Sequence, residues 1–308
     1  MAIARNHHFL PQGYLRQFTD AGNRNGRLHV FDLTTQKSFY TNPRNVASQK
    51  DFNRVEVEGQ PPDFLETQLA AMEDKAVSVI RKMTKCDQLV RDDDLVWVVN
   101  LIALLLVRNP RARESLRRAR VQTARIMGDL LVSDQRLYES HMRAAREAGY
   151  ITGEGVSFTR MKSFVNGGDY TIEVDQHALI RTEMSAFDSV LRMVGKRVWS
   201  LLTASKDAPD FITCDHPVTT VYKDRTRGGP IGVGLPHTEM VFPIGPRHAL
   251  YSVFEDPFKP VVTIKPRGVA AMNTRILMHA ERQLYSRADR FSMLRDGDVV
   301  TFSSGRKA

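Results

Sequence analysis

Hydrophobic and polar residues alternate along two short stretches in the first quarter of the chain. The stretches are Arg27–Leu33 and Lys37–Thr41, and a Thr-Thr-Gln turn separates them. A period of two is typical of β-strands, because successive side chains point to opposite faces of a sheet. The pattern therefore predicts a β-hairpin, preceded by a loop-rich segment over residues 1–25.

The middle of the chain follows a helical period instead. Between Phe64 and Met83 apolar residues recur about every 3.6 positions, after the helix-start signal Pro61-Pro62-Asp63. The same reasoning predicts further helices from the acidic run 92–94 to Val107, from Pro110 to about 131, from 134 to 148, and from 175 to 203. Residues 150–172 are rich in glycine, and we expect a short hairpin there.

The last third of the chain is strand-like, with proline and glycine turns between short apolar runs. Strands are predicted at 211–213, 218–222, 239–243, 249–253, 261–264 and 283–286, and one helix at 266–282. We therefore expect a single α+β domain over residues 1–308. It would consist of a loop and hairpin (1–60), a helical region (61–205) and a strand-rich region with one helix (206–302). The helices would pack with a mixed or antiparallel sheet formed from the N-terminal hairpin and the C-terminal strands.

Composition supports a folded protein: 42% of the 308 residues are hydrophobic. The longest apolar run, Leu95–Val107, is shorter than the roughly 18 residues that a membrane-spanning helix needs. No signal-peptide pattern opens the chain, and two cysteines provide neither a disulfide framework nor a cysteine-based zinc site. We therefore expect a cytoplasmic protein that does not bind a membrane.

The net charge of +9 and the pI near 9.7 favour nucleic acid as a partner. The excess charge is concentrated between residues 108 and 125, where seven arginines accompany a single acid, Glu114. Arginine suits bidentate phosphate contacts. The arginines predicted to contact phosphate are Arg108, Arg111, Arg113, Arg117, Arg118 and Arg120. The alternative is a solvated helix face that keeps the protein soluble.

The N-terminal stretch Asn6-His7-His8 is the first candidate for chemistry. Imidazole titrates near neutral pH and can serve as general acid, general base or metal ligand. Adjacent histidines on an extended chain point to opposite sides, so one of them at most reaches a given site. Apolar residues such as Phe9 and Leu10 would anchor this segment in the core. The alternative is an exposed, disordered terminus.

A second candidate is the segment Phe211–Val218, in which an apolar strand leads to Asp215 and His216 before Pro217. A carboxylate at a strand end can bind a metal or orient a histidine, or it can simply close a turn. Glu66 and Glu73, seven residues apart on one helix, could hold a divalent ion or be solvated acids. The cofactor is therefore unknown, with a divalent metal ion as the candidate.

Several residues along the chain form a recognisable set. They are Asn6, His8, Pro11, Gln12, Leu15, Arg16 and Phe18 at the start, the Asp51-Phe52 pair, the segment 211–218, the turn Pro243-Ile244-Gly245-Pro246, and Asn273. Together they resemble the pattern of the domain of unknown function 4238 family, over nearly the whole chain. Cys214 replaces a serine of that pattern, and His216 occupies a variable position. The resemblance implies His8 rather than His7, and Asp215 rather than His216, as site residues.

From these observations we expect a hydrolase that acts on nucleic acid, a nuclease. His8 would be the acid, base or metal ligand, Gln12 and Arg16 would stabilise phosphate charge, and Asp215 would orient His8 or bind a metal. Some members of the family are associated with bacterial defence against phage, so the resemblance implies an antiviral effector role. The alternative is a non-catalytic module that binds nucleic acid or protein, in which His8 and Asp215 form a structural contact.

Overall fold

The computed structural model describes residues 5–55, 58–91, 93–153, 155–224, 226–255 and 259–303. The chain divides into two compact units. The first unit consists of residues 1–112 and 180–308, and the second unit of residues 113–179. The single domain expected over residues 1–308 thus contains two compact units. Both boundaries fall inside continuous helices, α4 (Pro110–Leu131) and α7 (Gln176–Gly195), so no linker composition marks them in the sequence.

The fold is α+β, as predicted, and the described strands lie in the first unit. The N-terminal hairpin shares a sheet with C-terminal strands, because Phe31 pairs with Leu284. The described strand pairs are antiparallel except for β10 with β5. The hairpin sheet has the strand order β3 (Lys37–Thr41), β2 (Leu28–Asp32), β11 (Gln283–Ser286) and β6 (Thr213–Cys214). The five-stranded sheet has the order β10 (Val261–Ile264), β5 (Val198–Ala204), β9 (His248–Val253), β8 (Thr238–Gly245) and β7 (Thr219–Tyr222). Two further sheets are strand pairs, β1 (Asn6–His8) with β4 (Ser48–Lys50) and β12 (Arg290–Arg295) with β13 (Asp298–Ser303).

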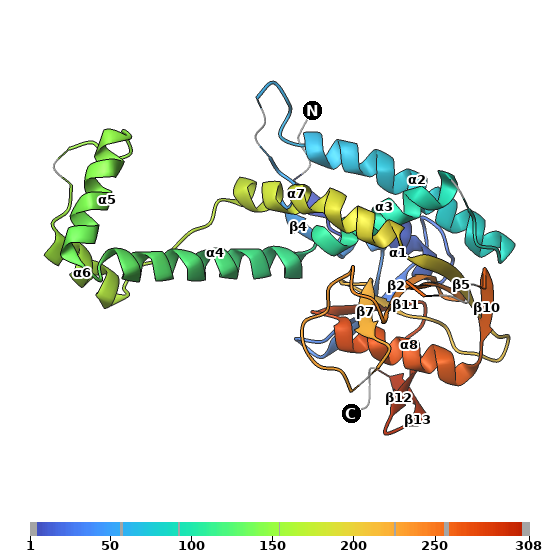
Figure 1. The fold of residues 1–308 in the computed structure, drawn as a ribbon. Coiled ribbons are helices and arrows are strands. Elements are labelled where there is room, and N and C mark those ends of the chain that lie inside the picture. Colours follow the sequence, from blue (N-terminus) through green and yellow to red (C-terminus); the bar gives the residue numbers. More distant parts are fainter. Residues whose placement is uncertain are drawn as a thin grey trace. The chain divides into compact units, whose positions relative to one another are not determined.

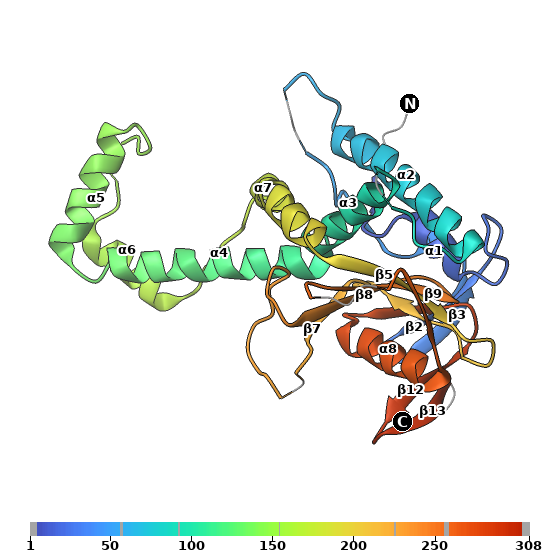
Figure 2. The ribbon, with the colours of Figure 1, turned by 45° about the vertical axis from the view of Figure 1, so that its right-hand side comes forward.

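Helices cover the strands of the first unit on two sides. Helices α1, α2 and α3 lie on one side and α8 lies on the other (Figures 1 and 2). Among the described residues no single helix is both long and apolar enough to cross a membrane, although α3 and α4 meet that test as a pair. The helical segments of this unit, apart from its parts of α4 and α7, are α1 (Gln12–Leu15), η1 (Arg16–Phe18), η2 (Pro43–Asn45), α2 (Phe64–Cys86), α3 (Asp93–Val107) and α8 (Pro266–His279).

The five-stranded sheet is buried on both faces, which explains its nearly continuous apolar strands. In β5, Leu201 belongs to the core shared with α2 and α3, whereas the next residue, Leu202, belongs to the core shared with α8. The same alternation places Phe242 in the first core and Val241 in the second. Successive residues of one strand therefore pack against helices on opposite faces of the sheet.

Two predictions fail in the segment between residues 150 and 204. The helix predicted over 175–203 ends at Gly195, and the apolar run that follows it is β5, the strand between β10 and β9. A strand buried on both faces lacks the polar alternation that would distinguish it from a helix. The hairpin predicted over 150–172 is instead helix α6 (Phe158–Gly167), whose first turn is capped by the Ser157 hydroxyl.

The second unit contains most of α4, together with α5 (Gln135–Glu147) and α6. Asp134 caps α5 by accepting a hydrogen bond from the backbone N–H of Leu137. The Tyr138 ring packs 5.7 Å from that of Phe158, and its hydroxyl donates to the carbonyl of Val156. These contacts join α5 to α6.

Arg108, at the end of α3, joins three elements of the first unit. Its side chain is only 1% exposed; Nη2 lies 2.6 Å from Oε1 of Glu73 in α2, and Nη1 donates to the carbonyl of His8 in β1. Burial raises the pKa of Glu73 to about 7, although the Arg108 charge opposes this shift. A buried guanidinium presents no surface to phosphate, so Arg108 does not belong with the predicted phosphate-binding arginines.

We predict that Arg108→Met lowers the free energy of unfolding by about 3–5 kcal/mol, because it leaves the Glu73 carboxylate buried without its cation. The measurement is urea unfolding near pH 8, where Glu73 is ionised. The matched control is Lys82→Met, which breaks the exposed Lys82–Asp94 pair and should change the stability far less, because water screens this pair. Equal effects of the two substitutions would show that Arg108 does not hold the fold together.

Candidate functional site

The two N-terminal histidines lie on β1, which pairs with β4 and was not predicted from the sequence. Because the backbone is extended, their side chains point to opposite sides, as expected. His7 is buried, and its Nδ1 accepts a hydrogen bond of 2.9 Å from the backbone N–H of Asn53. His7 therefore ties β1 to the segment after β4.

His8 is half-buried, and its Nδ1 lies 3.5 Å from Nε2 of Gln12. Burial lowers the pKa of the His8 imidazole, which favours its neutral form. The structure thus brings His8 and Gln12 together, as predicted. Arg16 is half-buried at the start of η1, and within the described residues it forms no hydrogen bond or ion pair with His8 or Gln12.

Asp215 closes a turn of the backbone. Its Oδ1 accepts the N–H of Glu281, and its Oδ2 accepts those of Arg282 and Gln283, at 2.7–2.9 Å. Burial raises the pKa of Asp215, against the lowering effect of these three bonds. In the described part of the chain no hydrogen bond links Asp215 to His8, so the structure does not form the predicted pair.

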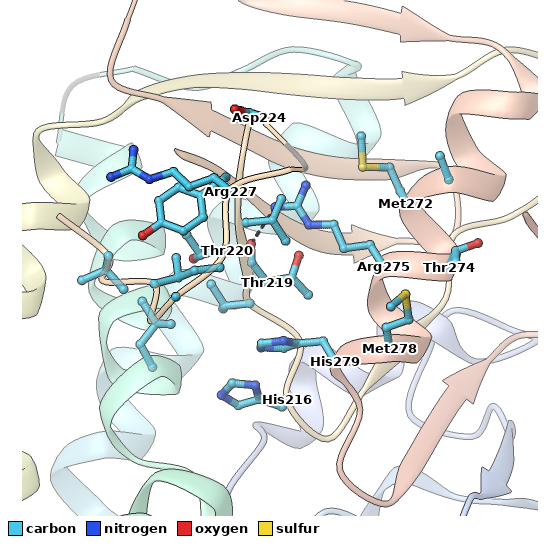
Figure 3. Close-up of a pocket in the computed structure, with 18 of the residues that line it drawn as sticks. His216, Thr219, Thr220, Asp224, Arg227, Met272, Thr274, Arg275, Met278 and His279 are labelled. Carbon is cyan, nitrogen blue, oxygen red and sulfur yellow. Dashed lines mark hydrogen bonds between the residues drawn. The ribbon is translucent and has the colours of Figure 1, made fainter. Parts of the chain in front are cut away.

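A cavity of about 810 Å³ lies in the first unit, away from the predicted centre. Strand β7, the loop after it and helix α8 provide most of its wall (Figure 3). The wall is apolar over much of its area, and its polar groups include Thr219, Thr220 and Arg275 between the histidines and Asp224 (Figure 3). Residues that line the cavity include Leu106, Arg111, His216, Val218, Thr219, Val221, Tyr222, Arg227, Ile231, Val233, Met272, Arg275, Met278 and His279.

His216 and His279 lie side by side at one end of this cavity (Figure 3). Their rings are stacked, with centroids 4.4 Å apart and planes inclined by 26°. Among the described residues, Nδ1 of His216 and Nε2 of His279 are buried without a hydrogen-bond partner. Burial, together with the nearby Arg111 charge, lowers the pKa of His216 to about 3 and that of His279 to about 4. Both imidazoles are therefore neutral at physiological pH.

Arg111, one of the predicted phosphate-binding arginines, lies next to these histidines. Its Nε is 3.7 Å from Oε2 of Glu281, and its Nη1 is 3.5 Å from the carbonyl oxygen of His279. The side chain is about half exposed. Arg111 and His216 also line a second cavity of about 390 Å³, together with Asp215 and residues of β4. The two cavities therefore share this pair of residues.

The loop between β7 and β8 forms the wall around Arg227 and is held by a buried arginine. Arg197 donates from Nη1 to the carbonyl of Val233 at 3.0 Å, and it also bonds to Thr238 and Ser252 in β8 and β9. Burial lowers the pKa of Arg197 to about 10, so it stays charged. The loop wall is thus attached to the five-stranded sheet.

The two glutamates considered as a metal site have protein partners. Glu66 accepts a hydrogen bond from the Asn53 amide, and Glu73 pairs with Arg108. Within the part of the chain that the structure describes, no group of three or more His, Cys, Asp or Glu residues is arranged to hold a metal ion. The divalent ion considered from the sequence thus has no candidate site among those residues.

The model of a family described as "Protein of unknown function (DUF4238)" matches residues 6–290, nearly the whole chain. The protein belongs to the DUF4238 family. No curated protein matches the chain, and no solved structure does. The family's description names no activity for this DUF4238 protein.

Sequence reasoning missed the cavity end formed by His216 and His279. His216 follows the aspartate of the DUF4238 pattern at a variable position, and His279 ends a helix in which no motif marks it. The signal that was present is the Asp-His-Pro turn, which ends a strand with two polar side chains. Nothing in the sequence connects that turn to a residue more than sixty positions later.

We predict that this DUF4238 protein loses stability as the pH falls from about 6.5 towards about 4. In that window an unfolded chain protonates both imidazoles, whereas the folded protein keeps them neutral, so lowering the pH favours unfolding. The double substitution of His216 and His279 by Gln should flatten the decline, measured by urea unfolding at several pH values. His141→Gln, on the exposed surface of α5, should leave it unchanged. If the double variant lost stability with falling pH as steeply as the wild type, His216 and His279 would not be the groups responsible for the decline.

Proposed function

We propose that the protein binds nucleic acid, with the arginines of α4 contacting the phosphate backbone. The observation that carries this proposal is a surface hollow in the second unit bordered by Arg117, Arg118 and Arg125. None of the described residues of α4 is buried, and the Arg118 side chain is 76% exposed. Three guanidinium groups around one hollow match the bidentate geometry that phosphate oxygens accept.

The local acid does not cancel this charge. Glu114 pairs with both Arg117 and Arg118 at 2.7 Å, and these hydrogen bonds lower the pKa of Glu114 to about 2. One carboxylate neutralises one charge at most, so the pairing orients two guanidinium groups and leaves the surface basic. Arg113 and Arg120, also predicted to contact phosphate, lie on the same helix. Phosphate contacts of this kind bind without reading the base sequence.

We predict that Arg118→Ala and Arg125→Ala each weaken nucleic-acid binding, because each removes one phosphate contact. In each variant the logarithm of the association constant should fall less steeply with the logarithm of the salt concentration, and the magnitude of this slope should be smaller by about 0.7–0.9. Fluorescence anisotropy with labelled RNA and DNA oligonucleotides measures this slope. Arg295→Ala, an exposed arginine of β12 in the first unit, is the matched control and should change nothing. Absent or salt-insensitive binding by the wild-type protein would refute the proposal.

Hydrolysis of the bound nucleic acid is the second candidate function, which we propose for the His216–His279 pair. The two imidazoles and Arg111 lie together at one end of the cavity. A neutral imidazole can take a proton from water as its oxygen forms a bond to phosphorus, and a protonated imidazole can donate to the oxygen that leaves as its bond to phosphorus breaks. A bound phosphate would raise the pKa of both imidazoles and allow that division of roles. The defence role that the family resemblance implies would follow from such an activity.

We predict that the purified protein cleaves RNA or DNA. His216→Ala and His279→Ala should each reduce the cleavage rate at least 100-fold, because a general acid or base contributes roughly 10²–10⁴ in rate. His8→Ala should reduce the rate less than tenfold. Gel analysis of labelled substrate and toxicity on expression give two readouts. Salt-dependent binding without cleavage by wild type would leave the protein as a binding module. Loss of cleavage in His8→Ala alone would return the centre to the N-terminal segment.

A further inference from the structure

The cavity of the first unit has the size and wall of a small-molecule site. Its volume of about 810 Å³ lies within the range of about 300–1,000 Å³ that such sites occupy. Apolar side chains from four elements line it, among them Leu106 of α3, Val221 of β7 and Met272 of α8. A few polar groups at fixed places would then orient a ligand.

The two ends of the cavity differ in chemistry. His216 and His279 lie at one end, with Arg111 beside them, whereas Arg227 and Asp224 lie towards the opposite end (Figure 3). The first end holds hydrogen-bond donors and a positive charge. At the opposite end, Asp224 contributes a carboxylate to the lining. This carboxylate already accepts hydrogen bonds from the backbone N–H and the hydroxyl of Thr226.

Three side chains at the histidine end could bind the same anion. Neutral His216 offers one N–H donor, and Arg111 offers a planar guanidinium. The His279 ring already hydrogen-bonds to the backbone of Val218, so its Nε2 becomes a donor when a bound anion raises the pKa of this imidazole. Arg275, further along the wall, forms a buried pair with Glu239 at 3.0 Å and does not add to this group. Glu281 lies farther from Arg111, at 3.7 Å, and both of these side chains are exposed, so water screens their pairing. Donors from three side chains suit the three terminal oxygens of a phosphate better than the two oxygens of a carboxylate.

The opposite end provides a surface for a flat group. The Arg227 guanidinium lies 4.5 Å from the centroid of the Tyr222 ring, and the Tyr222 hydroxyl is held by the carbonyl of Pro230. Stacked guanidinium and aromatic planes extend readily to a further aromatic ring, as in the stacking of bases on arginine and tyrosine. Ile231 and Val233, from the loop that also carries Arg227, add apolar surface to the cavity wall.

We infer that this cavity binds a phosphomonoester that carries a planar aromatic group, of which a nucleoside monophosphate is the simplest example. The phosphate lies against His216, His279 and Arg111, and the aromatic group lies towards Tyr222 and Arg227. The inference goes beyond nucleic-acid binding by α4 and beyond cleavage, because a small ligand in this cavity requires neither.

Isothermal titration calorimetry of the whole protein with AMP tests this inference. AMP should bind, and adenosine and inorganic phosphate should each bind at least tenfold more weakly. His216→Gln, Arg111→Gln and Arg227→Gln should each weaken AMP binding at least tenfold. The matched controls His141→Gln and Arg295→Gln, at exposed positions outside the cavity, should bind AMP as the wild type does.

The outcomes separate this inference from the proposed function. Arg118→Ala should weaken nucleic-acid binding. If this variant binds AMP as tightly as the wild type does, ligand binding in the cavity is independent of nucleic-acid binding by α4. Histidine ring signals of the wild type, observed by NMR, should shift on AMP addition, and this readout does not depend on whether the variants fold. The inference would be overturned if AMP did not bind, or if adenosine or inorganic phosphate bound as tightly as AMP. A preference for laurate, a fatty-acid anion without an aromatic group, over AMP would also overturn it.

Discussion

The buried charge of Arg108 is the constraint on which the first unit depends. A guanidinium group inside a protein needs a charged or carbonyl partner for its donors, since unpaired burial is costly. Arg108 meets this need at Nη2 with Glu73 and at Nη1 with the carbonyl of His8, so α3, α2 and β1 are held in a single arrangement. Its Nε is buried without a hydrogen-bond partner among the described residues. Strand β1 then pairs with β4, although neither strand is longer than three residues.

The residues that follow Arg108 connect this core to the cavity. Asn109 donates to the carbonyls of Leu105 and Leu106 at the end of α3, and its Oδ1 accepts the N–H of Ala112 in α4. One buried asparagine thus ends one helix and begins the next. Arg111 consequently lies beside His279, on the wall of both cavities. The arginine run therefore has three parts: a core residue, a cavity residue and the exposed row of the second unit.

Local patterns predicted the elements that depend on local physics. The hairpin β2–β3 and the helices α2 and α3 agree with their expected ranges, because periodicity reports a buried face directly. Strand β5 was missed because it is buried on both faces, and β1 because its partner lies about forty residues away. The contacts within the cavity could not be predicted for the same reason. The motif identified Asp215 and His8, but no local pattern connects His216 with His279, whose contact depends on the packing of α8.

The neighbours Asp215 and His216 show how one short segment serves structure and site together. The two residues lie in the bend after β6, where Asp215 binds the amides of the α8–β11 turn while His216 lines both cavities. Asn273, also in the family pattern, is buried and bridges Ile212 to the carbonyls of Asp210 and Ser292. The pattern residues at this strand are therefore structural ties. His216, the next residue after Asp215, faces the ligand-sized space instead, so one short segment both fixes the backbone and lines the cavity.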